Sequence, residues 1–465
     1  MPPVIRGKIL AWALGLLLIY TLFSLTGLFS GNQVISLAVF FGIILSILFF
    51  WRLRVAFAFI GIFVLFITGL IDIPHLVEFA GLDIVVFLIG MMIVVGFLEE
   101  RHFFEYILNR LMKVARTPMG VMVMLMGMSA LSAALVDEVT SILFMTALVL
   151  RLASRLAIPF QPLLISVVFA TNIGSSATVV GNPVGVMIAL RAGLSFAEFL
   201  RWATPISITT LIVTMFICYV YYRKYLRVMG ERLSVYQLAS AGLQPDNGVV
   251  DKLDKKALLL FASTISLLVL HTRIENALSL EKNTVLVAAP LLGAAIALFL
   301  QKEHARELFE KRVDWWTLTF FLMFFATVGT LKYVGVTGIF ASVFTSAAGG
   351  DLKLAIPLLG YISGFMSAFM DNILAVAVWI PIIQELGEAG LYTYPLWWTL
   401  LFAGTLMGNL TLIGSTANIV AIGMIERRKI GHISLRDWIK IGALVSIPTF
   451  SLALLLLYLQ LPLMA

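Results

Sequence analysis

Long apolar stretches constrain this chain more than any other feature. The sequence has 465 residues, of which 61% are hydrophobic and only 12% are charged, whereas a soluble domain is about half apolar and about one quarter charged. A membrane-crossing helix needs roughly 20 mostly apolar residues. The segments that reach or approach this length are 9–29, 55–71, 203–222, 257–270, 283–300, 315–330 and 441–459. The chain is therefore predicted to be an all-α polytopic membrane protein.

We expect about 11 transmembrane helices plus two re-entrant hairpins. The predicted crossings are 9–29, 34–50, 55–71, 83–98, 161–188, 203–222, 257–272, 283–300, 315–335, 397–423 and 441–460. The predicted hairpins are 119–150 and 354–384. Each hairpin is too long for one span and short for two.

Polar side chains near the middle of each hairpin support this interpretation. Asp137 and Glu138 occupy the first, and Asp371 and Asn372 occupy the second. A straight transmembrane helix would bury these groups in hydrocarbon. A hairpin places them instead at a tip inside protein or a wet cavity, where non-helical backbone is tolerated.

The net charge of +7 is distributed over short loops. A cytoplasmic N-terminus places 26 of the 32 Lys and Arg residues on the inside, as expected from the positive-inside rule. The first hairpin then opens inside and the second outside. The start of the chain, with Arg6 and Lys8, lacks a small-residue cleavage site and is predicted to be a retained helix. These patterns predict an integral protein of a prokaryotic inner (plasma) membrane that contacts lipid and not nucleic acid.

The sequence contains an internal repeat at an offset of about 233 residues. LSAALVDEVTSILFMTALV (131–149) matches GFMSAFMDNILAVAVWIPI (364–382), and ATVVGNPVGVMIA (177–189) matches LTLIGSTANIVAI (410–422). Because the two hairpins open on opposite sides, the repeats are predicted to be inverted, an arrangement that places a transporter's site near the midplane. The predicted divisions are an extra N-terminal helix (1–33), the first repeat (34–222), a cytoplasmic linker (223–256) and the second repeat (257–465).

Two predicted helices, 161–188 and 397–423, are interrupted by small and polar residues. A broken helix frees N–H groups that attract anions and carbonyls that suit small cations, and an intramembrane carboxylate indicates function by default. The helix-breaking residues are Gly174, Gly181, Pro183, Gly408 and Gly414. The predicted substrate- or ion-binding residues are Asp137, Glu138, Thr140, Asn172, Ser175, Ser176, Thr178, Asn182, Asp371, Asn372, Asn409, Thr411, Ser415, Thr416 and Asn418.

Motifs of other classes are missing from the sequence. There is no P-loop, no His-Glu-x-x-His and no Gly-x-Ser-x-Gly, so we predict a transporter and not an enzyme, with no cofactor and no metal centre. The coupling ion is expected to be Na⁺ or H⁺. Five methionines in the segment 119–128 are predicted to face lipid.

Four ordered motifs resemble the ion transporter superfamily over about residues 50–460. They are VDEVTSILFMTALVLRLA, ATNIGSSATVVGNP, SAFMDNILAVAVWIP and GNLTLIGSTANIVAIGMIERR. The likeness is to its citrate-transporter-like branch, which includes arsenite permeases, the P protein and silicon-efflux carriers. The resemblance implies a homodimer with a scaffold domain and a mobile, elevator-like transport domain. It also implies that Asp137 to Thr140 and Asp371-Asn372 are site residues at the hairpin tips.

The hairpin tips differ from those of dicarboxylate symporters, which carry Ser-Asn-Thr. This chain has Asp-Glu-Val-Thr from Asp137 and Asp-Asn-Ile-Leu from Asp371. The expected function is therefore coupled transport of a small inorganic solute, such as an oxyanion, arsenite or silicic acid, with H⁺ or Na⁺. The alternatives are a Na⁺/H⁺ antiporter and a dicarboxylate or citrate symporter.

Overall fold

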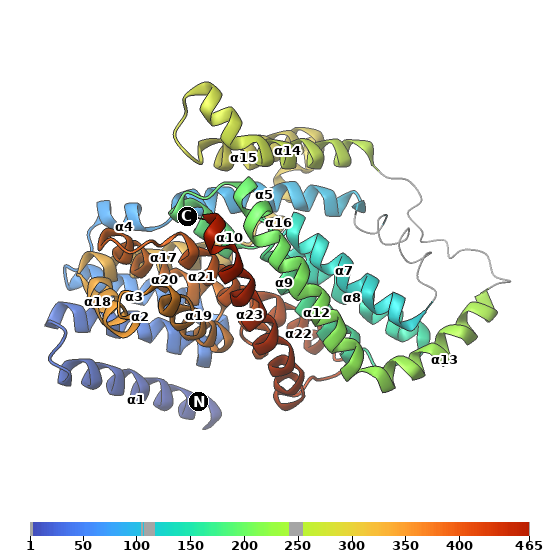
Figure 1. The fold of residues 1–465 in the computed structure, drawn as a ribbon, viewed down its shortest axis with the longest axis horizontal. Helices are drawn as coiled ribbons and strands as arrows, with labels where there is room; N and C mark the ends of the chain where they lie inside the picture. The colour runs from blue at the N-terminus through green and yellow to red at the C-terminus, as the bar shows by residue number, and fades with distance from the viewer. Residues whose placement is uncertain (1–2, 104–105, 107–116, 241–253, 465) are drawn as a thin grey trace. The chain divides into compact units, whose positions relative to one another are not determined.

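The computed structural model describes residues 3–103, 106, 117–240 and 254–464, and within these ranges it contains helices and no strand (Figure 1). Part of the predicted linker 223–256 lies outside the described residues. Three of the 26 basic residues predicted to lie on the inside, Arg110, Lys113 and Arg116, also lie outside them. The helices form two compact units. The first comprises Met1–Val86, Val313–Ala355 and Ala377–Thr393, and the second comprises Phe87–Arg312, Ile356–Val376 and Tyr394–Ala465.

The first unit is organised around one apolar helix, α17, which packs against α2, α3, α4 and α18. Ala326 of α17 is buried beside Ile62 and Leu65 of α3. The helices of this unit are α1 (Pro3–Leu25), α2 (Gly31–Phe50), the 3₁₀ turn η1 (Trp51–Leu53), α3 (Arg54–Ile67), α4 (Ile73–Phe79), α17 (Trp315–Tyr333) and α18 (Val336–Ala348). Three further helices have one end in each unit: α5 (Leu82–Glu100), α19 (Leu352–Phe369) and α20 (Asn372–Glu388).

The second unit is centred on α9, which packs against α7, α8, α12, α21 and α22. Its helices are α7 (Pro118–Leu135), α8 (Glu138–Leu156), α9 (Gln161–Ser175), α10 (Pro183–Ala192), α11 (Phe196–Glu198), the π-helix η2 (Phe199–Ala203), α12 (Thr204–Tyr221), α13 (Arg223–Ser240), α14 (Lys255–Leu278), α15 (Thr284–Gln301), η3 (Lys302–His304), α16 (Ala305–Arg312), α21 (Tyr394–Met407), η4 (Gly408–Leu410), α22 (Thr416–Arg427) and α23 (Leu435–Met464). All thirteen described residues of α9 from Leu163 to Ser175 are buried, so this helix is surrounded by protein.

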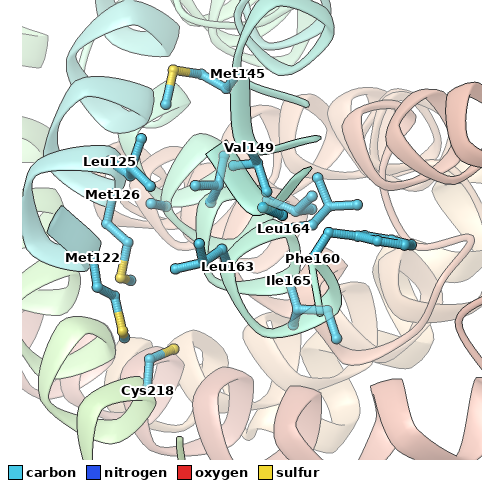
Figure 2. Packing of buried hydrophobic residues seen from close by; sticks show 14 of the residues in the cluster. Met122, Leu125, Met126, Met145, Val149, Phe160, Leu163, Leu164, Ile165 and Cys218 are labelled. Atoms are coloured by element: carbon cyan, nitrogen blue, oxygen red, sulfur yellow. The ribbon is translucent and has the colours of Figure 1, made fainter. Parts of the chain in front are cut away.

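The core of the second unit changes one expectation about α7. Met122 and Met126 are 2% and 0% exposed and pack with Leu125, Leu163 and Cys218 (Figure 2). The prediction that the methionine-rich segment faces lipid is therefore wrong for these two side chains. They lie one turn apart on α7, in a cluster that also contains residues of α9 and α12. Met119, by contrast, is 50% exposed.

Helices end at both predicted hairpin tips and at both predicted breaks. Asp137 separates α8 from α7, which it contacts, and Asp371 separates α20 from α19. The hairpin helices have 18, 19, 18 and 17 residues, so they extend beyond the predicted bounds 119–150 and 354–384. The breaks separate α9 from α10 and α21 from α22.

Eleven helical stretches among the described residues are long and apolar enough to cross a membrane. The predicted number of eleven is confirmed, but the stretches that make up this number differ from the predicted ones. The hairpin helices α7, α8 and α19 meet the criterion, α2 and α3 form one continuous stretch, and the halves of the broken helices are each too short. The re-entrant character of the hairpins therefore stays a prediction.

Short or polar helices were the elements that the sequence pattern did not indicate. They are α4, α18 and α13, the last at the start of the predicted linker. Leu226, Met229 and Leu233 of α13 are buried, which gives that polar segment one apolar face against α7 and α8.

Candidate functional site

The first hairpin tip is shaped by Asp137. Its backbone is extended, and its Oδ1 accepts hydrogen bonds from the backbone N–H groups of Val139 at 2.7 Å and Thr140 at 2.9 Å. Aspartate is a favoured N-cap because it satisfies N–H groups that have no partner within the helix. The cap explains why α8 begins at the next residue, Glu138, whose side chain is 0% exposed.

The second tip has the same form, with one additional contact. Asp371 Oδ1 accepts a hydrogen bond from the backbone N–H of Ile373 at 3.0 Å. Its Oδ2 accepts one from the hydroxyl of Thr416, the first residue of α22, at 2.6 Å. Asp371 is 5% exposed, so it is held between the second hairpin and the second helix break.

The two tips meet at Glu138. Its Oε1 accepts a hydrogen bond from Asn372 of the second tip, and its Oε2 accepts one from Ser175 at the end of α9, both at a long 3.5 Å. The negative charges of Asp137 and Asp371 also act on Glu138. We call Asp137, Glu138 and Asp371 the carboxylate cluster. Among the described residues, no Lys, Arg or His forms an ion pair with Glu138, so its donors are electrically neutral.

The first helix break is folded tightly against the end of α9. Asn182 caps α10 by accepting from the N–H of Gly185 at 2.6 Å, and its Nδ2 donates to Ser175 Oγ at 2.7 Å. The single hydroxyl proton of Ser175 is shared between the backbone carbonyl oxygen of Asn172 at 2.9 Å and Glu138 Oε2 at 3.5 Å. A Cβ atom at Gly181 would overlap the backbone of Ser175, so this return of the chain requires glycine.

The second break is tied to the first through buried amides. Asn172 Nδ2 donates to Asn409 Oδ1 at 2.7 Å and to Asn418 Oδ1 at 2.8 Å, and its Oδ1 accepts from Ser415 Oγ at 2.9 Å. We call Asn172, Asn409, Ser415 and Asn418 the amide cluster. All four side chains are 0% exposed. Ser415 additionally caps α22.

One contact recurs at matching positions in the two halves of the chain. Thr178 Oγ1 donates to the carbonyl oxygen of Ala134 near the end of α7, and Thr411 Oγ1 donates to that of Ala368 near the end of α19. The last carbonyl groups of a helix have no partner within it. Each break therefore satisfies one such carbonyl of a hairpin and fixes the hairpin beside it.

Replacing either threonine with valine is expected to destabilise the protein. Thr178→Val and Thr411→Val keep the side-chain shape but leave a buried carbonyl unpaired, at a cost of about 1–3 kcal/mol. Thr209→Val is the matched control, because Thr209 is only half-buried and its hydroxyl bonds within its own helix, to Pro205 O. The measurement is the thermal unfolding midpoint in detergent. A midpoint unchanged in both buried variants would contradict the anchoring role.

Ser176 is a predicted site residue that lies away from the carboxylate cluster. It donates to Ile173 O and pairs with Ser207 of α12 at 2.7 Å. The residues brought together around the carboxylates are Asp137, Glu138, Thr140, Ser175, Asn182, Asp371, Asn372 and Thr416. Trp438 was not among the predicted residues, because its sequence context is that of an ordinary core tryptophan. Its Nε1 donates to Asn409 O at 3.0 Å.

Comparisons with known proteins agree with this architecture. A family model described as citrate transporter matches residues 44–403 and 341–464. An uncharacterized transporter of Mycobacterium tuberculosis is 34% identical over 385 residues, covering 81% of this chain and 86% of the relative. The human P protein is 25% identical over 448 residues, and the match covers 80% of this chain but only 52% of the P protein.

A solved structure shares the fold. The YdaH transporter of Alcanivorax borkumensis, described as having an unusual topology, superposes with a TM-score of 0.52 at 15% identity, covering 87% of this chain and 89% of that chain. The family match extends over most of the sequence and includes both hairpins and both helix breaks. The resemblance stated for the four motifs is thereby confirmed, and the chain is a membrane transporter that belongs to the citrate transporter family.

Proposed function

We propose that this protein is a secondary active transporter that couples movement of a small inorganic solute to H⁺ or Na⁺. The observation that carries the proposal is Glu138, a fully buried carboxylate where the two hairpin tips meet the first helix break. A charge in such a place is costly unless it is paired or neutralised. Binding of a proton or a monovalent cation would neutralise this charge and so lower the free energy of the buried site.

The charges around the cluster narrow the class of solute. Helices α8, α10, α20 and α22 all begin beside it, and the positive ends of α8 and α20 are already offset by Asp137 and Asp371. With Glu138 added, an unaccompanied oxyanion is disfavoured. The site suits a neutral hydroxylated solute, such as arsenous or silicic acid, or an anion that enters together with its coupling cation.

Matching contacts in the two halves support an inverted-repeat transport mechanism. The Thr178 and Thr411 bonds, the two aspartate-capped tips and the two glycine-containing breaks recur at the offset of about 233 residues noted in the sequence. We infer elevator-type alternating access, in which hairpins and breaks move together within a homodimer. The bacterial relatives and the basic loops support a plasma-membrane location with a cytoplasmic N-terminus.

A second candidate function is Na⁺/H⁺ antiport. The specific observation in its favour is that three carboxylates share one site, which suits a cation as the only substrate. The two candidates differ in what drives ion movement. A transporter of a neutral solute moves ions only when its solute is present, whereas an antiporter exchanges Na⁺ for H⁺ alone.

Reconstituted proteoliposomes test both candidates. Arsenite or silicic acid uptake is measured under an imposed pH or Na⁺ gradient, with a pH-sensitive dye inside the vesicles. Asp371→Asn keeps the tip geometry and the Thr416 hydroxyl but removes one charge, so it is expected to lower gradient-driven uptake by about tenfold or more. Na⁺-dependent pH changes without added solute would instead favour antiport. Unchanged coupled uptake in Asp371→Asn would remove Asp371 from the mechanism.

A further inference from the structure

Asn172 has bonded both of its side-chain donors to protein. A primary amide offers two N–H donors and one oxygen with two acceptor lone pairs. Its Nδ2 donates to Asn409 Oδ1 and Asn418 Oδ1, at 2.7 and 2.8 Å, and its Oδ1 accepts from Ser415. A solute or ion could therefore bind the Asn172 side chain only at the second lone pair of Oδ1, and this side chain is fully buried.

The neighbours of Asn172 determine the orientation of this amide. Asn418 Nδ2 donates to two backbone carbonyl oxygens, those of Gly408 at 2.9 Å and Thr411 at 2.8 Å. Turning the Asn418 amide would break both bonds, so its Oδ1 has to face Asn172 as an acceptor. Asn409 Nδ2 similarly donates to Phe169 O at 3.4 Å. Asn172 can therefore serve the network only as a donor to both.

The chain around Asn409 is also enclosed from the other side. Trp438 of α23 donates to Asn409 O at 3.0 Å and packs edge-on against Phe169, with ring centroids 5.6 Å apart. A Cβ atom at Gly442 would lie 2.7 Å from Leu410 O, which shows how closely α23 covers the break. The second break is therefore packed against both α9 and α23.

We propose that Asn172 is a positioning residue that fastens the two helix breaks into one body, and that it does not bind the transported solute or the coupling ion. The Asn172 side chain reaches the site only through the backbone of α9, because the Ser175 hydroxyl lies 2.9 Å from the backbone carbonyl oxygen of Asn172 and 3.5 Å from Glu138 Oε2. The inference concerns the same site as the proposed function. Only its uptake measurement depends on that function being correct. Under this proposal Glu138, Ser175 and Asn372 contact the solute, whereas the amide cluster only holds the helix breaks together.

The test combines a stability cycle with transport kinetics. Thermal unfolding midpoints are measured in detergent, without solute, for Asn172→Ala, Asn418→Ala, the double variant and Asn172→Asp. Ser446→Ala is the control, because Ser446 is fully buried in α23 of the same unit and its hydroxyl has no hydrogen-bond partner among the described residues. Arsenite uptake into proteoliposomes provides KM and maximal rate for each folded variant.

We expect Asn172→Ala to lower the midpoint on the order of 5 °C, and the double variant to fall little further because the two residues share one network. Asn172→Asp should be equally damaging, because a carboxylate cannot donate to two amide oxygens. The KM for arsenite should stay within about twofold while the maximal rate falls. If Asn172→Ala does not fold, Asn409→Ala, which removes one of these bonds, should give a smaller loss.

Other results would overturn the proposal. Additive midpoint losses, or a midpoint unchanged in Asn172→Ala, would show that the amide cluster does not act as one network. A KM raised by about tenfold or more with an unchanged midpoint would make Asn172 a ligand. Tighter Na⁺ binding in Asn172→Asp would do the same. Absence of arsenite uptake by the unaltered protein would count against the proposed function but would leave the stability cycle valid.

Discussion

Glu138→Gln is expected to reduce gradient-driven transport by about 100-fold, near the upper end of typical coupling effects. Glutamine preserves the length of the side chain and can still contact Ser175 and Asn372, but it carries no charge and takes up no proton. The energetic difference between the occupied and empty site then disappears. A ligand that does not distinguish two states cannot shift their populations.

The measurement is counterflow and gradient-driven uptake in the same proteoliposomes. Counterflow needs no ion gradient, so it should persist in Glu138→Gln while uphill uptake is lost. The matched control is Glu275→Gln, because Glu275 is also a buried glutamate, 2% exposed, but it accepts from the backbone N–H of Val285 in the first turn of α15. Full uphill uptake by Glu138→Gln would contradict a coupling role for this carboxylate.

The location of Glu138 was predictable from sequence, but its contacts were not. A carboxylate in an apolar stretch has few physical solutions, so the hairpin tips followed from Asp137, Glu138 and Asp371. The partners of Glu138 are Ser175 and Asn372, which lie 37 and 234 residues away in the chain. No local sequence pattern indicates which of the many polar side chains contacts Glu138.

The amide cluster illustrates the same limit. Asn172, Asn409 and Asn418 were predicted as ligands because a buried amide in a broken helix suits either a solute or a protein partner. Only the three-dimensional arrangement reveals that Asn172 donates to both of the others. The burial of Met122 was likewise missed, since a methionine-rich stretch in an apolar helix has no polar face that marks its outside.

Short helices were missed for a different reason. The seven residues of α4 are too few for a reliable apolar period, and α13 is predominantly polar in composition. Both are stabilised by tertiary contacts, α4 against α17 and α13 against α7 and α8. Tertiary packing contributes most of the stability of such helices, and the local sequence does not contain it.

Gly181→Ala is expected to cost about 3 kcal/mol and to abolish transport, because the new methyl group has no space. A Cβ atom there would overlap the backbone of Ser175, with the Cα and carbonyl carbon both at 2.8 Å. Backbone atoms cannot move aside as the end of a flexible side chain can. The clash would push apart the break that lets Asn182 donate to Ser175 Oγ.

The equivalent glycine makes the prediction more specific. A Cβ atom at Gly414 would lie 2.5 Å from the carbonyl oxygen of Gly408, so Gly414→Ala should cause a similar loss in the second break. The control is Gly127→Ala, because its nearest neighbour is the flexible end of Met215 at 3.8 Å and alanine favours a helix. The thermal unfolding midpoint and arsenite uptake are measured for all three variants. If Gly181→Ala unfolded at the same temperature as Gly127→Ala, the tight return of the first break would not be required for the fold, and the close approach of Ser175 to Glu138 would have to be maintained by the hairpin alone.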